Sequence, residues 1–375
     1  MKPKRFAVFT LMIALTASLP LVAHAQLADP GFSYVDVNND GLYTPGNGDI
    51  PITPSILSAI QSSGSFDTQQ SIPGIYQAPE CPASLIIPAS QQLAFPTPLF
   101  LQAGENVVIH GSITAPALAL CTDDDGQADL TGATVNVNSS LQVYAEEGVI
   151  LDGSAISCSD PDSEVHVCTD DQVSAIGASI FTGMELSIRA EDGVDMDNAS
   201  IYAQSADSMV KVCSDGGIQA NSFITAGTVR FRADDGGITL NNGAITANSV
   251  RLCSDGQTDV SGSFFTVNGP MKLAGDDGVL GITSAISATQ LCVEGDCGVD
   301  FSQSSLYASA GPIWMQSDDG PISLNAAYVS SAGGLAACSD GGVDVTSASI
   351  SADCYNSAIC RLRLNPGGRE FHLPL

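Results

Sequence analysis

Short runs of alternating apolar and polar residues recur along most of the chain. In one representative stretch, Val229, Phe231 and Ala233 alternate with arginines, and the alternation returns at 238–240 and 243–247 after intervening turns. Alternation with a period of two places one face of a strand in a core and the other in water. Each repeat of the pattern therefore predicts three short strands, which we number first, second and third in chain order.

An acidic residue followed by glycine separates the first strand of each repeat from the second. The series begins at Gly104 and ends at Gly341, and its period of about 21 residues is typical of solenoids. Clear members are Asp125-Gly126, Glu147-Gly148, Asp192-Gly193, Asp215-Gly216, Asp235-Gly236, Asp255-Gly256, Asp277-Gly278, Asp319-Gly320 and Asp340-Gly341. In a solenoid, strands of successive coils pair about 4.8 Å apart and their inward faces form one core. A helical repeat is excluded, because Gly and Asp interrupt every candidate helix.

The third strand of each repeat has the form small-x-aliphatic-x-small, which suits a narrow coil. Examples are Ala133-Val135-Val137, Ala178-Ile180-Thr182, Ser222-Ile224-Ala226 and Ser284-Ile286-Ala288. We therefore predict an all-β fold over residues 83–375. It is a single-stranded right-handed parallel β-helix (solenoid) of about 12 coils, each of about 21 residues as the period requires. A short N-terminal capping segment, residues 26–82, precedes it.

The repeat resembles those of filamentous-haemagglutinin-type adhesins and of the wider right-handed parallel β-helix group. The resemblance is clearest at 186–203, which reads Leu-Ser-Ile-Arg-Ala-Glu-Asp-Gly-Val-Asp-Met-Asp-Asn-Ala-Ser-Ile-Tyr-Ala, and it extends from about Phe100 to Ala352. It implies the solenoid fold and a role in surface adhesion or as a stalk. The secretion domain and the C-terminal barrel of that family's export route are not recognisable in the chain.

The segment 1–25 has the features of a signal peptide. Lys2, Lys4 and Arg5 form a basic start, residues 6–22 are apolar, and Ala-His-Ala precedes the expected cleavage point. This arrangement predicts export, to the extracellular space or the cell surface, with the periplasm as another destination. No later segment reaches about 18 consecutive apolar residues, so no membrane span is expected.

Beyond this leader the chain is strongly acidic. With 41 acidic residues against nine basic ones, its net charge is near −32. Nucleic acids and anionic membranes are bound through basic patches, so both are excluded as expected partners. The composition favours calcium or other cations, and leaves glycans and other surface proteins as candidate partners.

The sharpest local motif is Asp-x-Asn-x-Asp-Gly at residues 36–41, in which alternate oxygen donors precede a glycine. It resembles EF-hand and dockerin calcium loops. The twelfth position is Asn47, where a bidentate acid is expected, and Asp49 substitutes for it if the Pro-Gly turn at 45–46 lengthens the loop. The predicted calcium ligands are Asp36, Asn38, Asp40, the Leu42 carbonyl, Thr44 and Asp49. The alternative is a metal-free turn rich in Asp and Asn.

One short helix is expected just after this loop, over residues 53–64. Thr53 is a candidate N-cap, an apolar stripe of Ile56, Leu57 and Ile60 follows, and a glycine ends the helix.

Stacking the coils also places the carboxylates of the acidic turns in one column. Two unit charges about 4.8 Å apart repel by about 0.9 kcal/mol in water. Splayed, solvated side chains would relieve this repulsion, and weak bridging by calcium is the alternative.

Eleven cysteines occur in the chain. Six of them lie near the acidic turn in about every second coil: Cys121, Cys168, Cys213, Cys253, Cys292 and Cys338. Counting back from the glycine places Cys213 inward, and counting forward from Val212 places it outward. Thiols two coils apart would be too distant for a disulfide. The better candidate pairs are Cys354–Cys360, Cys292–Cys297 and Cys158–Cys168.

Groups suited to catalysis are few. The histidines beyond the leader are His110, His166 and His372, and no Gly-x-Ser-x-Gly elbow is present. We therefore expect a structural or adhesive protein and not an enzyme. Uniform coil lengths favour this class, since a polysaccharide-cleaving enzyme should carry long loop insertions on one face.

The rival expectation is a carbohydrate-binding or pectate-lyase-like β-helix, a resemblance that implies exposed carboxylates with calcium and a basic residue as the base. The series Arg189, Arg230, Arg232, Arg251 and Lys272 falls in first strands of neighbouring coils, where it could bind acidic sugars or neutralise charge between coils. Trp314, the only tryptophan, is expected to point outward and could stack on a sugar.

Overall fold

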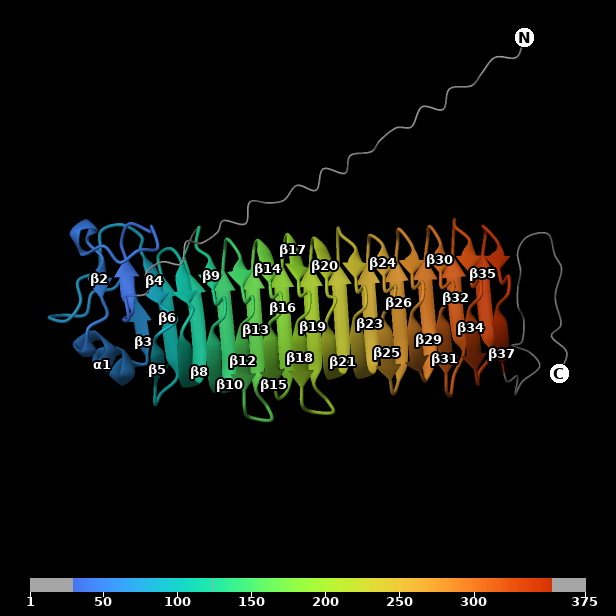
Figure 1. The fold of residues 1–375 in the computed structure, drawn as a ribbon, viewed down its shortest axis with the longest axis horizontal. Coiled ribbons are helices and arrows are strands. Elements are labelled where there is room, and N and C mark those ends of the chain that lie inside the picture. The colour runs from blue at the N-terminus through green and yellow to red at the C-terminus, as the bar shows by residue number, and fades with distance from the viewer. Residues whose placement is uncertain (1–29, 124, 353–375) are drawn as a thin grey trace, which may run out of the picture.

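The computed structural model describes residues 30–123 and 125–352. They form a parallel β-solenoid of about 13 turns with coils of about 21 residues, drawn out as a straight rod from the N-terminal to the C-terminal coil (Figure 1). The predicted all-β parallel solenoid is confirmed, with about one coil more than expected. Within these residues no helix is long and apolar enough to cross a membrane.

Each coil contributes strands to three faces, which we name the first, second and third face after the strand order used above. The second face is one 15-stranded sheet of short strands. Its members are β1 (Tyr34–Asp36), β2 (Ile50–Pro51), β4 (Ser84–Ile87), β7 (Val107–Ile109), β9 (Ala128–Asp129), β11 (Val149–Ile150), β14 (Gln172–Ser174), β17 (Gly193–Asp195), β20 (Gly217–Gln219), β22 (Ile238–Thr239), β24 (Thr258–Asp259), β27 (Val279–Leu280), β30 (Val299–Asp300), β33 (Ile322–Ser323) and β36 (Val343–Asp344).

The first face lies just before the acidic turns. Its strands are β3 (Ser65–Asp67), β6 (Leu99–Ala103), β13 (Glu164–Thr169), β16 (Glu185–Ala190), β19 (Met209–Ser214), β26 (Pro270–Gly275), β29 (Gln290–Gly295), β32 (Ile313–Ser317) and β35 (Leu335–Ser339). Four long strands bend from the third face into the first: β8 (Ser112–Thr122), β10 (Thr134–Ala145), β21 (Phe223–Ala233) and β23 (Ala244–Ser254).

The third face completes each coil. Apart from the bent strands it comprises β5 (Gln92–Ala94), β12 (Ala155–Cys158), β15 (Ser179–Thr182), β18 (Ser200–Ala203), β25 (Phe264–Val267), β28 (Ala285–Ala288), β31 (Ser305–Ala308), β34 (Tyr328–Ser331) and β37 (Ser349–Ala352). The predicted small-x-aliphatic-x-small register is confirmed here, because Ala178, Ile180 and Thr182 all point inward and are buried. Ile180 pairs with Ile156 on one side and Ile201 on the other, which continues an aliphatic column through the core.

The residue after most second-face strands also points inward, and at Gly281 and Phe301 the side-chain sizes in this column complement each other. Phe301 is fully buried there, one coil after Gly281. A Cβ atom on Gly281 would lie only 2.1 Å from Cε1 of Phe301, so the ring occupies the space that a side chain at 281 would need. Close packing of this kind makes neighbouring coils sensitive to each other's volume.

The N-terminal segment closes one end of the core. Strand β1 pairs in antiparallel fashion with β4 of the first coils, and β3 already pairs in parallel with β6. The expected helix is present as α1 (Pro54–Ser63). The Thr53 hydroxyl accepts a hydrogen bond from the Ile56 N–H at 3.3 Å, and Gly64 ends the helix in the left-handed conformation. Ile56 and Ile60 are buried against the first coils, so the segment is built onto the rod.

Candidate functional site

The predicted calcium loop leaves the second face at the end of β1. Asp36 and Asp49 are both almost fully buried. One oxygen of Asp36, Oδ2, accepts the Gly41 N–H at 2.7 Å, and Asp49 accepts the N–H groups of Val37 at 3.0 Å and Thr44 at 2.5 Å. A 3₁₀ turn, η1 (Pro45–Asn47), lengthens the loop and brings Asp49 back beside its start.

One oxygen in this loop has no partner. Oδ1 of Asp36 is buried and makes no hydrogen bond, although the residue is only 1% exposed. Burial raises the pKa of the Asp36 carboxyl, and the charges of Asp49 and Asp40 raise it further, while the Gly41 N–H lowers it. A buried carboxylate oxygen without a donor is costly, and a cation would satisfy it.

The remaining predicted ligands are held more loosely at the surface. Asp40 accepts hydrogen bonds from the Asn38 amide at 2.7 Å and the Leu42 N–H at 2.8 Å, and the Thr44 hydroxyl donates to the Leu42 carbonyl at 3.5 Å. Across residues 30–123 and 125–352, no three His, Cys, Asp or Glu side chains are gathered as a metal-binding group. An ion would therefore have to draw Asp40 toward Asp36 and Asp49.

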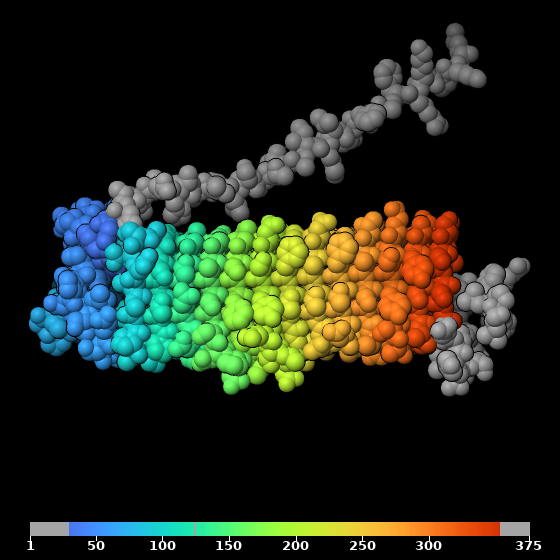
Figure 2. Space-filling view, turned by 60° about the horizontal axis from the view of Figure 1, so that its bottom comes forward, coloured from blue at the N-terminus to red at the C-terminus, as the bar shows by residue number. Residues whose placement is uncertain are grey.

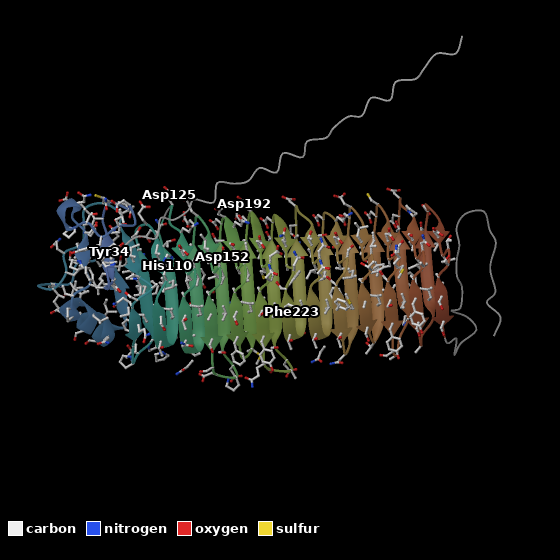
Figure 3. The ribbon with its side chains drawn as sticks, viewed as in Figure 1. Tyr34, His110, Asp125, Asp152, Asp192 and Phe223 are labelled. Carbon is white, nitrogen blue, oxygen red and sulfur yellow. The ribbon has the colours of Figure 1, made fainter. Side chains whose placement is uncertain are left out.

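The acidic turns form a continuous edge between the first and second faces. Figure 3 shows Asp125 and Asp192 at this edge, where most side chains are exposed. Neighbouring coils still affect each other. Burial and a hydrogen bond with Asp192 raise the pKa of Asp171, and burial together with the charges of Asp276, Asp318 and Asp319 raises that of Asp296.

The tertiary register decides the orientation of the repeat cysteines. Cys213 pairs with Arg189 and Arg232 on the outer surface of the first face, while Ser214 pairs with the inward Ala233. Forward counting from Val212 is therefore right and counting back from the glycine is wrong. The turns differ in length by one residue, Ser-Asp-Gly against Ala-Asp-Asp-Gly, and this shifts the count.

One member of the cysteine series leaves the common column. Cys121, Cys168, Cys213, Cys253 and Cys338 share an outward column, whereas Cys292 lies in the adjacent column between Lys272 and Trp314. Burial and the neighbouring Glu294 raise the pKa of the Cys292 thiol to about 11. Thiols of such high pKa are poor nucleophiles at neutral pH.

The candidate disulfides within the described residues do not form. Cys158, Cys168, Cys292 and Cys297 are all free thiols. Cys158 points into the core, where burial raises its pKa to about 12, while Cys168 points outward. The two side chains are on opposite sides of the chain, so the Cys158–Cys168 pairing is wrong, as is Cys292–Cys297. Cys354, Cys360 and His372 lie outside the described residues.

Basic side chains of the first face form two adjacent columns. Lys211, Arg230, Arg251 and Lys272 pair in register on four consecutive coils. Arg189 and Arg232 lie in the next column, beside Cys213. The sequence pattern indicates neighbouring coils, but it does not reveal this division into columns, and the predicted series leaves out Lys211.

A shallow groove of about 420 Å³ continues the basic column toward the C-terminal end. Its lining includes Arg251, Lys272, Cys292 and Trp314. Trp314 points outward as expected and is 44% exposed. The Lys272 ammonium forms an ion pair with Glu294 at 2.6 Å on the rim.

The third face carries a set of outward aromatic side chains that the sequence pattern does not predict. Phe181, Tyr202, Phe223, Phe264, Tyr307 and Tyr328 all lie at outward positions there. Phe181 and Tyr202 stack on successive coils with ring centroids 5.5 Å apart. Each occurs singly in an otherwise Ser- and Thr-rich position, and only coil stacking brings them onto one surface.

His110 and Asp129 form an ion pair on adjacent coils of the second face, with His110 Nε2 and Asp129 Oδ2 3.1 Å apart. The hydrogen bond that His110 donates to the Asp129 carboxylate raises the pKa of His110. Burial alone would raise the pKa of Asp129, but hydrogen bonds from His110 and Thr131 leave it lowered. The pair is therefore fully charged at mildly acidic pH.

The pair predicts a measurable pH dependence of stability. A group with a raised pKa in the folded state stabilises fully below its unfolded value, and this contribution is lost as the pH rises through the folded value. We expect the melting temperature to fall as the pH rises above about 6.5 and through the raised pKa of His110, and His110→Gln to flatten that fall. Because the histidine is partly exposed, the effect should be at most about 1 kcal/mol. Parallel melting profiles for wild type and His110→Gln would contradict the assignment.

Comparison with known proteins adds no relative. No protein-family model, curated protein sequence or solved structure matches this chain.

Proposed function

We propose that the chain is an exported structural or adhesive solenoid, which presents repeated outer surfaces to partners outside the cell. The observation that carries the proposal is the continuous strand pairing from β3 to β37, which aligns outward positions of successive coils in columns along the rod, with one register shift between Val137 and Ser140. Solenoids of stacked repeats bind through such extended surfaces. The predicted leader supports export, and the excess of carboxylates supports dependence on cations.

Open surfaces support binding in preference to cleavage. Figure 2 shows the coils as parallel rows of side chains across one face of the rod. The groove beside Trp314 on the first face is shallow. A second hollow of about 270 Å³, lined by Phe100 and Gln142 among others, also lies on the first face. Surfaces of this kind suit a long polymer or a partner surface better than a small enclosed substrate.

The proposal predicts adhesion without catalysis. Beads coated with residues 26–375 should be retained on a panel of immobilised polysaccharides and matrix surfaces, while beads coated with heat-denatured protein should not. The same protein should release no new reducing ends or unsaturated sugars. The adhesive role would be contradicted if the beads with native protein are retained on no surface, or if any polymer yields cleavage products.

We also propose that the loop 36–49 binds calcium and so fixes the N-terminal segment to the first coil. The unpartnered Asp36 Oδ1 supports this, as does a donor set of carboxylates, an amide, a carbonyl and a hydroxyl, which are the ligands that calcium prefers. Asp36, Asn38, Asp40, Leu42, Thr44 and Asp49 would hold the ion. Since β1 runs directly into the loop and pairs with β4, binding there should stabilise the end of the rod.

A further inference from the structure

All Lys and Arg side chains of the described residues lie on one face. The residues are Arg189, Lys211, Arg230, Arg232, Arg251 and Lys272, and they occupy five consecutive coils of the first face. We call this set the basic strip. The second and third faces of the described residues carry no Lys or Arg. In a chain with such an excess of acidic residues, this segregation concentrates positive charge on one surface.

The strip is only partly neutralised by the protein itself. Within the described residues Arg232 pairs with Asp234 and Lys272 with Glu294. The Arg251 guanidinium lies 3.3 Å from the Cys253 sulfur. The other three basic side chains form no ion pair within this part of the chain.

Stacking like charges is unfavourable unless an anion lies between or over them. Lys211, Arg230, Arg251 and Lys272 follow one another in register. Neighbouring strands are about 4.8 Å apart, so adjacent charges in the column repel each other. No acidic side chain stands between these four residues in the column. The arrangement suits a ligand whose negative charges repeat along a line.

Trp314 extends the strip with a different chemistry. Its column continues from Lys272 through Cys292 to the exposed indole ring, with the groove alongside. Pro270 and Pro312 form part of the groove wall, which is mostly apolar around the basic groups. The indole lies two strands beyond Lys272 in this column, and an exposed aromatic ring is suited to stacking against the flat face of a sugar ring.

We propose that the basic strip and Trp314 bind a linear anionic polysaccharide, with its carboxylate or sulfate groups on the basic column and one sugar ring on the indole. The assignment of this ligand class rests on the proposed adhesive function. A pyranose ring is about as long as the spacing between adjacent strands, so a polymer lying along the rod presents a charge near each coil. Single-stranded nucleic acid is the less suitable polyanion, because it is held by an aromatic platform for successive bases and the strip has one ring.

Binding can be tested on the mature chain, residues 26–375, by calorimetry or affinity electrophoresis. The probes are polygalacturonate for carboxylates, dextran sulfate for sulfates, unmodified dextran as the neutral control and an oligothymidylate of similar charge. We expect one or both anionic polysaccharides to bind with an affinity that falls as salt is raised, and dextran and the oligonucleotide to bind at least about tenfold more weakly. The stronger of the two anionic probes identifies the charged group.

Three variants assign that binding to the strip. Arg230→Gln with Arg251→Gln should weaken binding at least about tenfold and reduce its salt dependence, since charge-assisted hydrogen bonds are lost. Trp314→Ala should weaken binding severalfold without changing the salt dependence, because the indole is uncharged. Thr114→Glu with Ser287→Glu makes the same change in net charge at exposed positions of the third face, and should leave binding nearly unchanged.

The proposal is overturned if neither anionic polysaccharide binds, if the oligonucleotide binds as tightly, or if the third-face variant loses as much affinity as the arginine variant. Melting profiles confirm that each variant is folded. Bead adhesion that persists in the Arg230→Gln, Arg251→Gln variant would place adhesion on another surface, so this site can fail while the proposed function holds.

Discussion

Phe301→Ala is expected to lower the free energy of unfolding by about 3–5 kcal/mol, the largest effect of any single substitution proposed for this protein. The Phe301 ring is fully buried and fills space shared with the preceding coil. Truncation leaves a cavity between two coils, since strand pairing on both sides keeps the backbone from collapsing into it. Urea unfolding followed by circular dichroism measures the loss.

The surface provides a matched control for this change. Phe223→Ala removes the same ring from the third face, where the side chain is 64% exposed (Figure 3), and should alter stability by no more than about 0.5 kcal/mol. Similar losses for the two variants would contradict the packing assigned to Phe301.

The neighbouring glycine tests the same contact from the other side. Gly281→Ala should cost about 1–3 kcal/mol, because the new methyl group would collide with the Phe301 ring. Shortening that ring in the double variant Gly281→Ala, Phe301→Leu should recover part of the loss. Additive losses in the double variant would show that the two positions do not share one space.

Calcium is expected to raise the stability of the chain 26–375 by about 2.7 kcal/mol when its free concentration is about 100 times the dissociation constant. The gain arises because the ion binds the folded loop, where the buried Asp36 oxygen lacks a partner, and not the unfolded chain. Differential scanning calorimetry in calcium and in chelator measures the shift, and titration calorimetry should show one site.

Two isosteric variants distinguish calcium binding at the loop from calcium bridging along the acidic edge. Asp36→Asn keeps an oxygen that can accept the Gly41 N–H, yet it removes the buried charge and should abolish the calcium effect. Asp192→Asn removes one carboxylate of the acidic edge and should retain it. If Asp36→Asn keeps the full shift, calcium acts elsewhere, and bridging along the acidic edge becomes the favoured explanation.

The order of strands and turns could be read from the sequence because each coil repeats the same local chemistry. Alternation, a glycine at the acidic turn and small residues beside an aliphatic one specify strand, turn and inward face independently of distant contacts. The helix 54–63 was predictable for the same reason, since its cap, its apolar stripe and its terminal glycine are local signals.

Register between coils could not be read with the same accuracy. A difference of one residue in turn length reversed the orientation that counting back from the glycine gives Cys213. Cys292 stands two positions before the column of the other repeat cysteines, which Glu294 occupies in that coil, and only strand pairing shows that it is level with Trp314. The sequence does not predict an aromatic surface on the third face, because each of these residues stands alone in its own coil.

The repeat, the solenoid, the acidic edge and the candidate loop all follow from spacing along the chain, so the amino-acid sequence is enough to predict them. Contacts between coils cannot be predicted in this way: the column of basic groups from Lys211 to Lys272 and the packing of the Phe301 ring against Gly281 appear only in the folded chain, as does the contact of Asp49 with the start of the loop. The physical reason is that columns arise from hydrogen bonding between coils. Pairing sets the register between positions a whole coil apart in the chain, and each turn along the way can shift it by one.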